Sequence, residues 1–358
     1  MVFSLARIRI GILGVGNAAS ALVQGLYLCK EKGEEMEGIF RWQVGKYTPM
    51  DIEIVAAYDV DKRKVGRDLS EAIFSPPNNM MKLCDIPRLD VIVEKGYLAD
   101  SLGDITKRLI KIDEAPSVDI EDSLKEKGVE ILVNLVSSFS MESSRIYAKK
   151  SARARVAFIN CVPVIIASDK HYANLYRKTG VPIVGDDLES QIGSTYIHRL
   201  LLEMLHKRGV KIKATYALDV GGSPESLAAL EWRRVWLKSE IKTASIKSAL
   251  PYDIPAAAGS VDYVDFLKDL RDTVVYIHGS FFAGAPITIE MKIRVPDSLN
   301  AFNPLVDVIR ATKIALDRGI SGPLESVSAY AFKYPPKRYP PTIAEKRFEA
   351  FIKGELNN

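Results

Sequence analysis

A glycine-rich turn near the start of the chain, with the sequence GVGNAA at residues 14–19, most constrains the fold. An apolar run at residues 8–13 precedes it, and a helix-like segment follows from Ala19 to Leu28. Gly14 permits a tight turn, and Gly16 lets the backbone approach a phosphate closely. The N-terminus of the following helix offers free N–H groups to an anion. This order of strand, turn and helix predicts an α/β domain that binds the pyrophosphate of a dinucleotide.

The acidic residue that accompanies such a turn is expected to be Asp59, which ends the strand-like residues 53–58. Its carboxylate would accept hydrogen bonds from the adenine ribose. It lies roughly twice as far from the turn as the usual spacing of about 20 residues, and a polar insertion at residues 30–50 would explain the difference. The basic residues 62–64 could bind the additional phosphate of NADP, but Asp59 repels that phosphate, so NAD is expected. The alternative is a related domain in which the glycines serve packing alone.

Composition and charge limit the possible partners. The 358 residues are enough for two domains, and the hydrophobic fraction of 47% and charged fraction of 26% are typical of soluble globular proteins. A net charge of +4 is too small to indicate a nucleic-acid partner, but it is compatible with an anionic small substrate. The three cysteines are far apart, which fits a reducing cytoplasm. We expect no membrane span, because no apolar run approaches roughly 18 residues, and no metal site, because the histidines lack ligand spacing.

The order of segments predicts two structural units. The first half of the chain alternates strand-like and helix-like segments, which is typical of a parallel sheet with helices on both faces. Farther on, alternating apolar residues at 273–282 and 287–295 predict an antiparallel hairpin. We therefore predict an α/β fold with a Rossmann-like, NAD-binding domain at residues 1–190 and 305–358. An α+β domain for catalysis and oligomerisation is inserted at residues 191–304.

Polar loops follow three of the predicted parallel strands, at residues 134–138, 160–163 and 185–193. Ligands bind at this edge of an open α/β sheet. The third loop contains Asp186 and Asp187 just before a helix. Capping of that helix is the ordinary role of such aspartates, whereas their position after a strand favours a role in a site, and both interpretations stay open.

Several further stretches make the assignment more specific. They are residues 11–20 with 23–25, 57–61, 160–163, 184–187, 220–222, 313–319 and 328–330. In these stretches and in their order the chain resembles the myo-inositol-phosphate synthases (inositol-3-phosphate synthases) of the shorter prokaryotic type. The resemblance covers nearly the whole chain. It implies NAD as the cofactor, a sugar phosphate as the substrate and a homotetramer as the assembly.

The resemblance also implies a reaction. In the family, bound NAD oxidises C5 of glucose 6-phosphate, the resulting ketone acidifies C6, and C6 attacks the C1 aldehyde. The ketone is then reduced again, giving inositol phosphate with no net redox change, so the cofactor stays bound throughout. Such chemistry needs fixed positive charge beside the enolate and alkoxide oxygens, and a lysine partly shielded from water supplies it.

Site residues are assigned from the positions that match the family. Taken alone, any of the 49 lysines and arginines would be expected at the surface, so only the family position favours a lysine. Asp307, on the same predicted helix as Lys313, is expected to be solvated. The catalytic candidates are Lys242, Lys333, Asp262 and Asp187. The cofactor-binding candidates are Gly14, Gly16, Asn17, Ala18, Asp59, Ser137 and Asp186, and the substrate-binding candidates are Gly221, Gly222 and Lys313.

Three positions depart from the family pattern, all of them on the substrate side. The family usually carries a catalytic lysine at the position of Glu189, where a poorly solvated carboxylate would oppose an enolate. Asp219 and Ser223 each replace an asparagine. Three alternatives therefore stay open: an inositol-phosphate synthase that has moved a catalytic role to another group, a related NAD-dependent enzyme acting on a different sugar or polyol phosphate, and a non-catalytic NAD-binding homologue.

Overall fold

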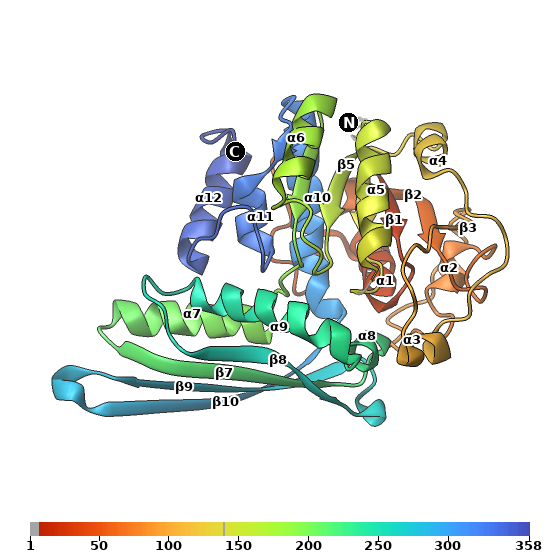
Figure 1. Ribbon diagram of the computed structural model, residues 1–358. Coiled ribbons are helices and arrows are strands. Elements are labelled where there is room, and N and C mark those ends of the chain that lie inside the picture. Colours follow the sequence, from red (N-terminus) through yellow and green to blue (C-terminus); the bar gives the residue numbers. More distant parts are fainter. Residues whose placement is uncertain (1–6, 139) are drawn as a thin grey trace.

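The computed structural model describes residues 7–138 and 140–358, which form two β-sheets with helices around them (Figure 1). The larger sheet has seven parallel strands in the order β11-β6-β5-β4-β1-β2-β3. This arrangement confirms the predicted α/β fold with a Rossmann-like parallel sheet. Its strands are β1 (Ile8–Leu13), β2 (Ile52–Asp59), β3 (Val93–Lys95), β4 (Ile131–Asn134), β5 (Ala157–Asn160), β6 (Pro182–Gly185) and β11 (Gly322–Pro323).

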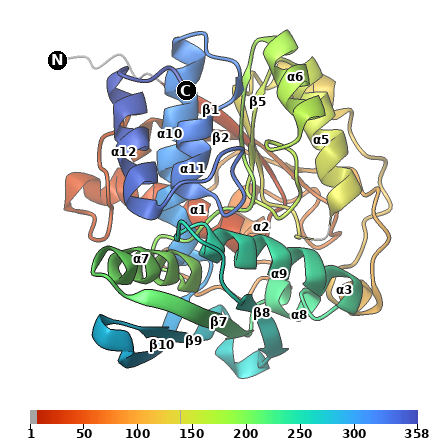
Figure 2. The same ribbon diagram turned by 60° about the vertical axis from the view of Figure 1, so that its left-hand side comes forward.

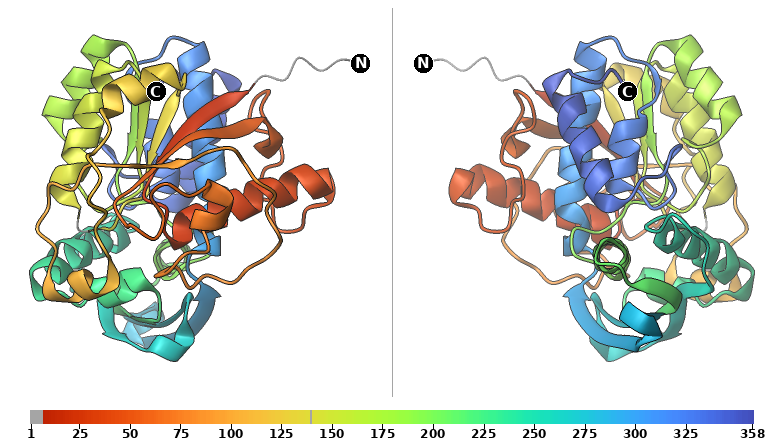
Figure 3. Two further views of the ribbon diagram at one scale, coloured as in Figure 1. Left: turned by 90° about the vertical axis from the view of Figure 1, so that its right-hand side faces the viewer. Right: turned by 90° about the vertical axis from the view of Figure 1, so that its left-hand side faces the viewer.

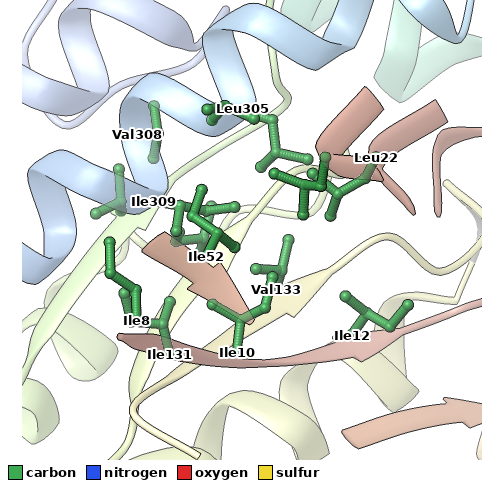
Figure 4. Packing of buried hydrophobic residues seen from close by; sticks show 14 of the residues in the cluster. Ile8, Ile10, Ile12, Leu22, Ile52, Ile131, Val133, Leu305, Val308 and Ile309 are labelled. Atoms are coloured by element: carbon green, nitrogen blue, oxygen red, sulfur yellow. The ribbon is translucent and has the colours of Figure 1, made fainter. Parts of the chain in front are cut away.

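Helices cover both faces of the parallel sheet because successive side chains of a strand point to opposite faces. In β4, Ile131 and Val133 belong to one apolar core and Leu132 to the other. The first core packs against α1, α10, α11 and α12, and the second against α4, α5 and α6 (Figures 3 and 4). The helices are α1 (Asn17–Lys32), α2 (Leu69–Ala72), α3 (Asp104–Leu109), α4 (Ile120–Glu126), α5 (Met141–Arg153), α6 (Lys170–Thr179), α7 (Ser194–Lys207), α8 (Pro224–Ala228), α9 (Trp232–Lys247), α10 (Phe302–Asp317), α11 (Glu325–Ala331) and α12 (Pro341–Lys353).

The second sheet has four strands in the order β10-β9-β7-β8, and β9 and β10 form the predicted antiparallel hairpin. Helices α7 and α9 cover one face of this sheet and separate it from the parallel sheet (Figures 1 and 2). On the other face Tyr216, Leu218 and Val274 are exposed. The strands are β7 (Lys211–Gly221), β8 (Ala256–Tyr263), β9 (Leu270–Ser280) and β10 (Pro286–Pro296). They all fall within residues 191–304, but the domain boundaries themselves stay a prediction.

Arg310 of α10 binds the backbone of the polar insertion between α1 and β2. This guanidinium is buried and donates hydrogen bonds to the backbone oxygens of Arg41 (2.9 Å) and Trp42 (2.7 Å). It also forms an ion pair with Asp307 at 2.6 Å. Asp307 is 1% exposed, so the expectation that it is solvated is wrong. The reason is that the insertion covers this part of α10.

Among the described residues, no helix combines the length and the apolarity that crossing a bilayer requires.

Candidate active site

The principal cavity lies at the carboxyl edge of the parallel sheet and has a volume of about 320 Å³. The strand order reverses between β1 and β4, and such a switch point is where open α/β sheets bind ligands. The two connections between the sheets, residues 186–193 and 297–301, both contribute to its wall. Six of the predicted cofactor-binding residues line this cavity: Gly14, Gly16, Asn17, Ala18, Asp59 and Ser137.

The glycine turn has the shape that a pyrophosphate requires. Gly14 has a φ of 83°, and a Cβ there would lie 2.7 Å from the backbone oxygen of Leu135. A Cβ on Gly16 would meet no heavy atom within 4 Å, so this glycine faces open space in the cavity. The N-terminus of α1, which begins at Asn17, receives no side-chain cap. Its first N–H groups are therefore available to an anion.

Asp59 lies at the end of β2 and lines the cavity beside the turn. Its Oδ2 accepts a hydrogen bond from the backbone N–H of Val15 at 2.7 Å. Two of the nearby basic side chains already have protein partners. Arg63 donates to Asp61 at 2.9 Å, and the buried Lys64 donates to the backbone oxygen of Val15 at 2.8 Å. Both side chains are therefore engaged within the protein. Lys64, one of the basic residues at 62–64 that the sequence offered for an additional phosphate, also lines the cavity.

Asn17 joins the glycine turn to the second sheet. Its Nδ2 donates to Oδ1 of Asn79 at 2.8 Å and to Oδ1 of Asp269 at 2.9 Å. Asp269 is buried, and desolvation raises its pKa to about 6 although Ser298 donates to it. The predicted catalytic Asp262 lies elsewhere: it is exposed on β8 and lines neither cavity. The structure thus brings Asp269, and not Asp262, beside the turn.

A smaller cavity of about 40 Å³ adjoins the principal one and shares Asp187, Lys333 and Arg271 with it. Lys333 donates to Oδ1 of Asp187 and to the backbone oxygen of Leu188, both at 2.9 Å. Arg271 forms an ion pair with Asp297 at 2.5 Å. The charged side chains around the smaller cavity are the cations Lys238, Lys242, Arg271 and Lys333 and the carboxylates Asp187, Asp219 and Asp297.

Lys242 of α9 is buried in the wall of the smaller cavity, where it pairs with Asp219 of β7. Burial lowers the pKa of Lys242, and the charge of Asp219 opposes that shift. Burial alone would raise the pKa of Asp219, but the charges of Lys242 and Arg271 lower it to about 2. The structure therefore brings Lys242, Lys333 and Asp187, three of the candidate catalytic residues, together around the smaller cavity.

Glu189 does not place a negative charge in the site. It is buried, its Oε2 accepts a hydrogen bond from Nη1 of Arg199 at 2.8 Å, and it lines neither cavity. Arg199 of α7 also donates to the backbone oxygen of Tyr339 at 2.8 Å. The expected opposition between this carboxylate and an enolate does not arise, because Arg199 neutralises Glu189 outside the cavities.

Two other predicted site residues lie outside the cavities. Asp186 is fully buried and accepts hydrogen bonds from Nδ2 of Asn160 (2.7 Å) and from the backbone N–H groups of residues 166–168. It therefore fixes the loop after β5. Lys313 forms ion pairs with Glu130 (2.6 Å) and Asp317 (3.2 Å). Glu130 directly precedes β4, so Lys313 lies at the amino edge of the sheet, opposite the site.

Gly221 and Gly222 also line neither cavity. A Cβ on Gly222 would lie 2.5 Å from the backbone nitrogen of Lys268, so this glycine serves close packing. Lys238 and Arg271 are cavity residues that the sequence analysis missed, although a signal existed for each. Lys238 precedes Lys242 by one helical turn, and four residues along a helix share a face. Arg271 and Thr273 alternate along β9, so they point to the same side of the sheet.

The fold and the position of the cavity define a Rossmann-like α/β protein with a second, cation-rich cavity. Residues 193–298 match the family model described as Myo-inositol-1-phosphate synthase. The chain is 41% identical over 356 residues to the inositol-3-phosphate synthase of Mycolicibacterium smegmatis, covering 97% of this chain and 98% of that protein. It is 38% identical over 360 residues to the enzyme of that name from Corynebacterium glutamicum, covering 98% and 99%. The chain belongs to the inositol-3-phosphate synthase family.

A solved structure agrees with this assignment. The myo-inositol-1-phosphate synthase-related protein from Thermotoga maritima is 25% identical, with a TM-score of 0.81. The match covers 97% of this chain and 98% of that one. Both the parallel sheet and the second sheet are therefore included in the shared fold.

Proposed function

We propose that this protein converts glucose 6-phosphate to myo-inositol phosphate by oxidation, enolisation, aldol cyclisation and re-reduction, with NAD as its bound cofactor. One observation carries the proposal: a continuous wall of residues joins the glycine turn at Gly14 and Gly16 to Lys333, and Lys333 also lines the cavity of Lys242. A dinucleotide and a small anionic substrate can therefore meet at Lys333. The names of the relatives support the same reaction.

The cofactor part of the proposal rests on the fit of the larger cavity. Gly14, Gly16 and the first N–H groups of α1 would hold the pyrophosphate, and Asp59 would accept hydrogen bonds from the ribose. When bound, NAD supplies an acceptor and donor of hydride. The protein's task is then to orient the sugar, exclude water and stabilise charge on the reacting oxygens.

Lys333 is suited to that last task. Its side chain is 16% exposed, and its ammonium group is held by Asp187 and by the backbone oxygen of Leu188. A positive charge fixed in a partly dry site stabilises a developing enolate or alkoxide without reorganisation. Asp187 sets the position of that charge.

The smaller cavity suits the substrate's phosphate. Ser194 and Thr195, in the first turn of α7, line it and are buried, and α7 begins without a side-chain cap. An anion there would face the helix N-terminus as well as Lys242 and Arg271. The carboxylates in the same wall limit the net positive charge of the cavity. Binding of the phosphate therefore depends on which of the cations can contact it.

A related enzyme acting on another sugar or polyol phosphate is the second candidate. The observation that favours it is the position of Ser223, one of the three residues at which the sequence departs from the expected family pattern: it lines the principal cavity and caps α8. A shorter side chain at that wall changes the contacts available to the sugar hydroxyls. Product analysis with several sugar phosphates separates the two candidates.

Two further parts of the proposal concern assembly and location. We propose a homotetramer in the cytoplasm. The exposed face of the second sheet, with Tyr216, Leu218 and Val274, supports burial against other copies. Multi-angle light scattering on the purified protein tests it: a tetramer mass is expected, and a monomer mass would contradict the proposal.

The reaction is tested with glucose 6-phosphate and NAD, followed by phosphorus NMR of the product. We expect inositol phosphate from the wild-type protein and at least a hundredfold lower rate from Lys333→Met. Lys313→Met is the matched control, because it removes a lysine at the opposite edge of the sheet. No inositol phosphate from the folded, NAD-bound wild type would overturn the proposed reaction, and a different product would favour the second candidate.

A further inference from the structure

Asp219 lies in the wall of the smaller cavity. The side chain projects from β7 towards α9, and the residue is 2% exposed. Its Oδ2 contacts Nζ of Lys242, and its Oδ1 accepts a hydrogen bond from Oγ1 of Thr273 at 2.7 Å. Both carboxylate oxygens are thus engaged, and the carboxylate is oriented towards one lysine.

Each cation around this cavity has a carboxylate of its own. Lys333 pairs with Asp187, Arg271 with Asp297 at 2.5 Å, and Lys238 with Glu225 at 3.3 Å. Asp219 is the carboxylate that pairs with Lys242, and Nη1 of Arg271 lies 3.9 Å from it. Among the described residues, no other carboxylate forms an ion pair with Lys242.

The other charged or titratable groups near Lys242 are mostly cations or neutral. They are Lys238 from α9 itself, His198 from α7, Arg271 from β9, Lys333 from the segment after α11, and Asp187 and Asp297 from the two connections. Strand β8 also packs against α9, but the residues that it contributes to the smaller cavity, Gly259 and Ser260, carry no charge. His198 is buried and bound to Thr215, and its pKa lies far below its usual value because of desolvation. Without Asp219, burial and neighbouring positive charge would both favour loss of the proton from Lys242.

We propose that Asp219 is a positioning residue that holds the ammonium of Lys242 in place and keeps it protonated across the working pH range. Lys242 then acts as a fixed positive charge and proton donor instead of a neutral base. The catalytic part of this inference rests on the proposed function, but the ionisation of Lys242 does not. Asparagine at position 219 keeps the shape and an acceptor oxygen and removes the charge, so it isolates the effect.

The ionisation is measured directly by NMR titration of the NAD-loaded protein labelled with ¹³Cε-lysine. The Lys242 signal is assigned by its absence in Lys242→Arg. In Asp219→Asn we expect its titration midpoint to fall by at least one pH unit, a tenfold change in the ionisation constant. Asp272→Asn is the matched control, since Asp272 lies on the same sheet and pairs with the outward-facing Arg294. An unchanged midpoint in Asp219→Asn would overturn the proposal.

A second measurement covers the case in which Asp219→Asn does not fold. In Lys242→Met, carboxyl ¹³C NMR should show the pKa of Asp219 rising from its low value of about 2 by at least one unit. An unchanged value would show that the two groups are not coupled and would overturn the proposal.

The catalytic consequence is tested by the pH profile of kcat. The wild type should keep its rate to a higher pH than Asp219→Asn, whose rate should recover when the pH is lowered. A uniform fall of kcat at every pH would mean a merely structural role and would contradict the catalytic part. A wild type without turnover would contradict the proposed function, while the NMR titrations would still decide the role of Asp219.

Discussion

Replacing Glu189 with glutamine should destabilise the protein strongly, although the side chain touches neither cavity. The side chains of Glu189 and Arg199 are 3% and 4% exposed, and the ion pair is 2.8 Å long. Oε1 of Glu189 and Nε of Arg199 already lack partners. Removing one partner of a buried pair costs about 3–5 kcal/mol because the other charge stays buried. Glutamine keeps one acceptor for Arg199, so we expect the lower end, about 3 kcal/mol, or roughly a hundredfold in the unfolding equilibrium.

Urea unfolding followed by circular dichroism measures this cost as a lower midpoint at an unchanged slope. Glu142→Gln is the matched control, because its pair with Arg145 is exposed and should contribute less than 1 kcal/mol. The double variant Glu189→Met/Arg199→Leu removes both charges and should recover most of the loss. Glu189→Lys should unfold more easily instead of gaining activity, since it would bury two cations together. A Glu189→Gln variant within 1 kcal/mol of the wild type would show that the buried pair of Glu189 and Arg199 does not contribute the expected stability.

Three further predictions follow from other parts of the structure. Desolvation lowers the pKa of His198 to about 3, so the folded state disfavours its protonation, and the free energy of unfolding should fall as the pH drops from about 6.5 towards 3. In His198→Gln this dependence of the free energy of unfolding on pH should become weaker by up to about 1.4 kcal/mol per pH unit, and an unchanged dependence in urea unfolding would contradict the prediction. Asp59→Ala should weaken NAD binding at least tenfold by calorimetry, and equal affinity would place the ribose elsewhere. Asp186→Asn should cost about 1–3 kcal/mol of stability because a buried acceptor of charge-assisted hydrogen bonds is lost; a change below 0.5 kcal/mol in urea unfolding would argue against its role in fixing the loop.

Local patterns in the sequence predicted the parallel sheet well. The turn at Gly14 and Gly16 combines an apolar strand, a residue with positive φ and a helix start within a dozen residues, and these constraints act over short distances. The hairpin of β9 and β10 was predicted for the same reason, since alternation along each strand and the intervening turn are local features. Helix α9 was not predicted, because its apolar residues follow no clear stripe.

The site was harder to predict, because its residues meet through tertiary contacts. Lys242 and Lys333 line the same cavity although Lys242 lies on α9 and Lys333 follows α11, far away in the sequence. Local sequence patterns likewise do not show which residue pairs with a charged side chain. Nothing near Glu189 in the sequence indicates that Arg199, on the following helix α7, neutralises it. Asp262 and Asp269 illustrate the same limit, since only the fold decides which of the two is buried beside Asn17.

The most direct test of the account follows the hydrogen on C5 of the substrate. Glucose 6-phosphate deuterated at C5 is incubated with the NAD-loaded protein, and the inositol phosphate is examined by mass spectrometry and NMR. Because hydride leaves and returns within one closed site, we predict one deuterium per product molecule at the original carbon, with no net reduction of NAD. Loss of the deuterium, or reduced cofactor accumulating in step with product, would contradict it.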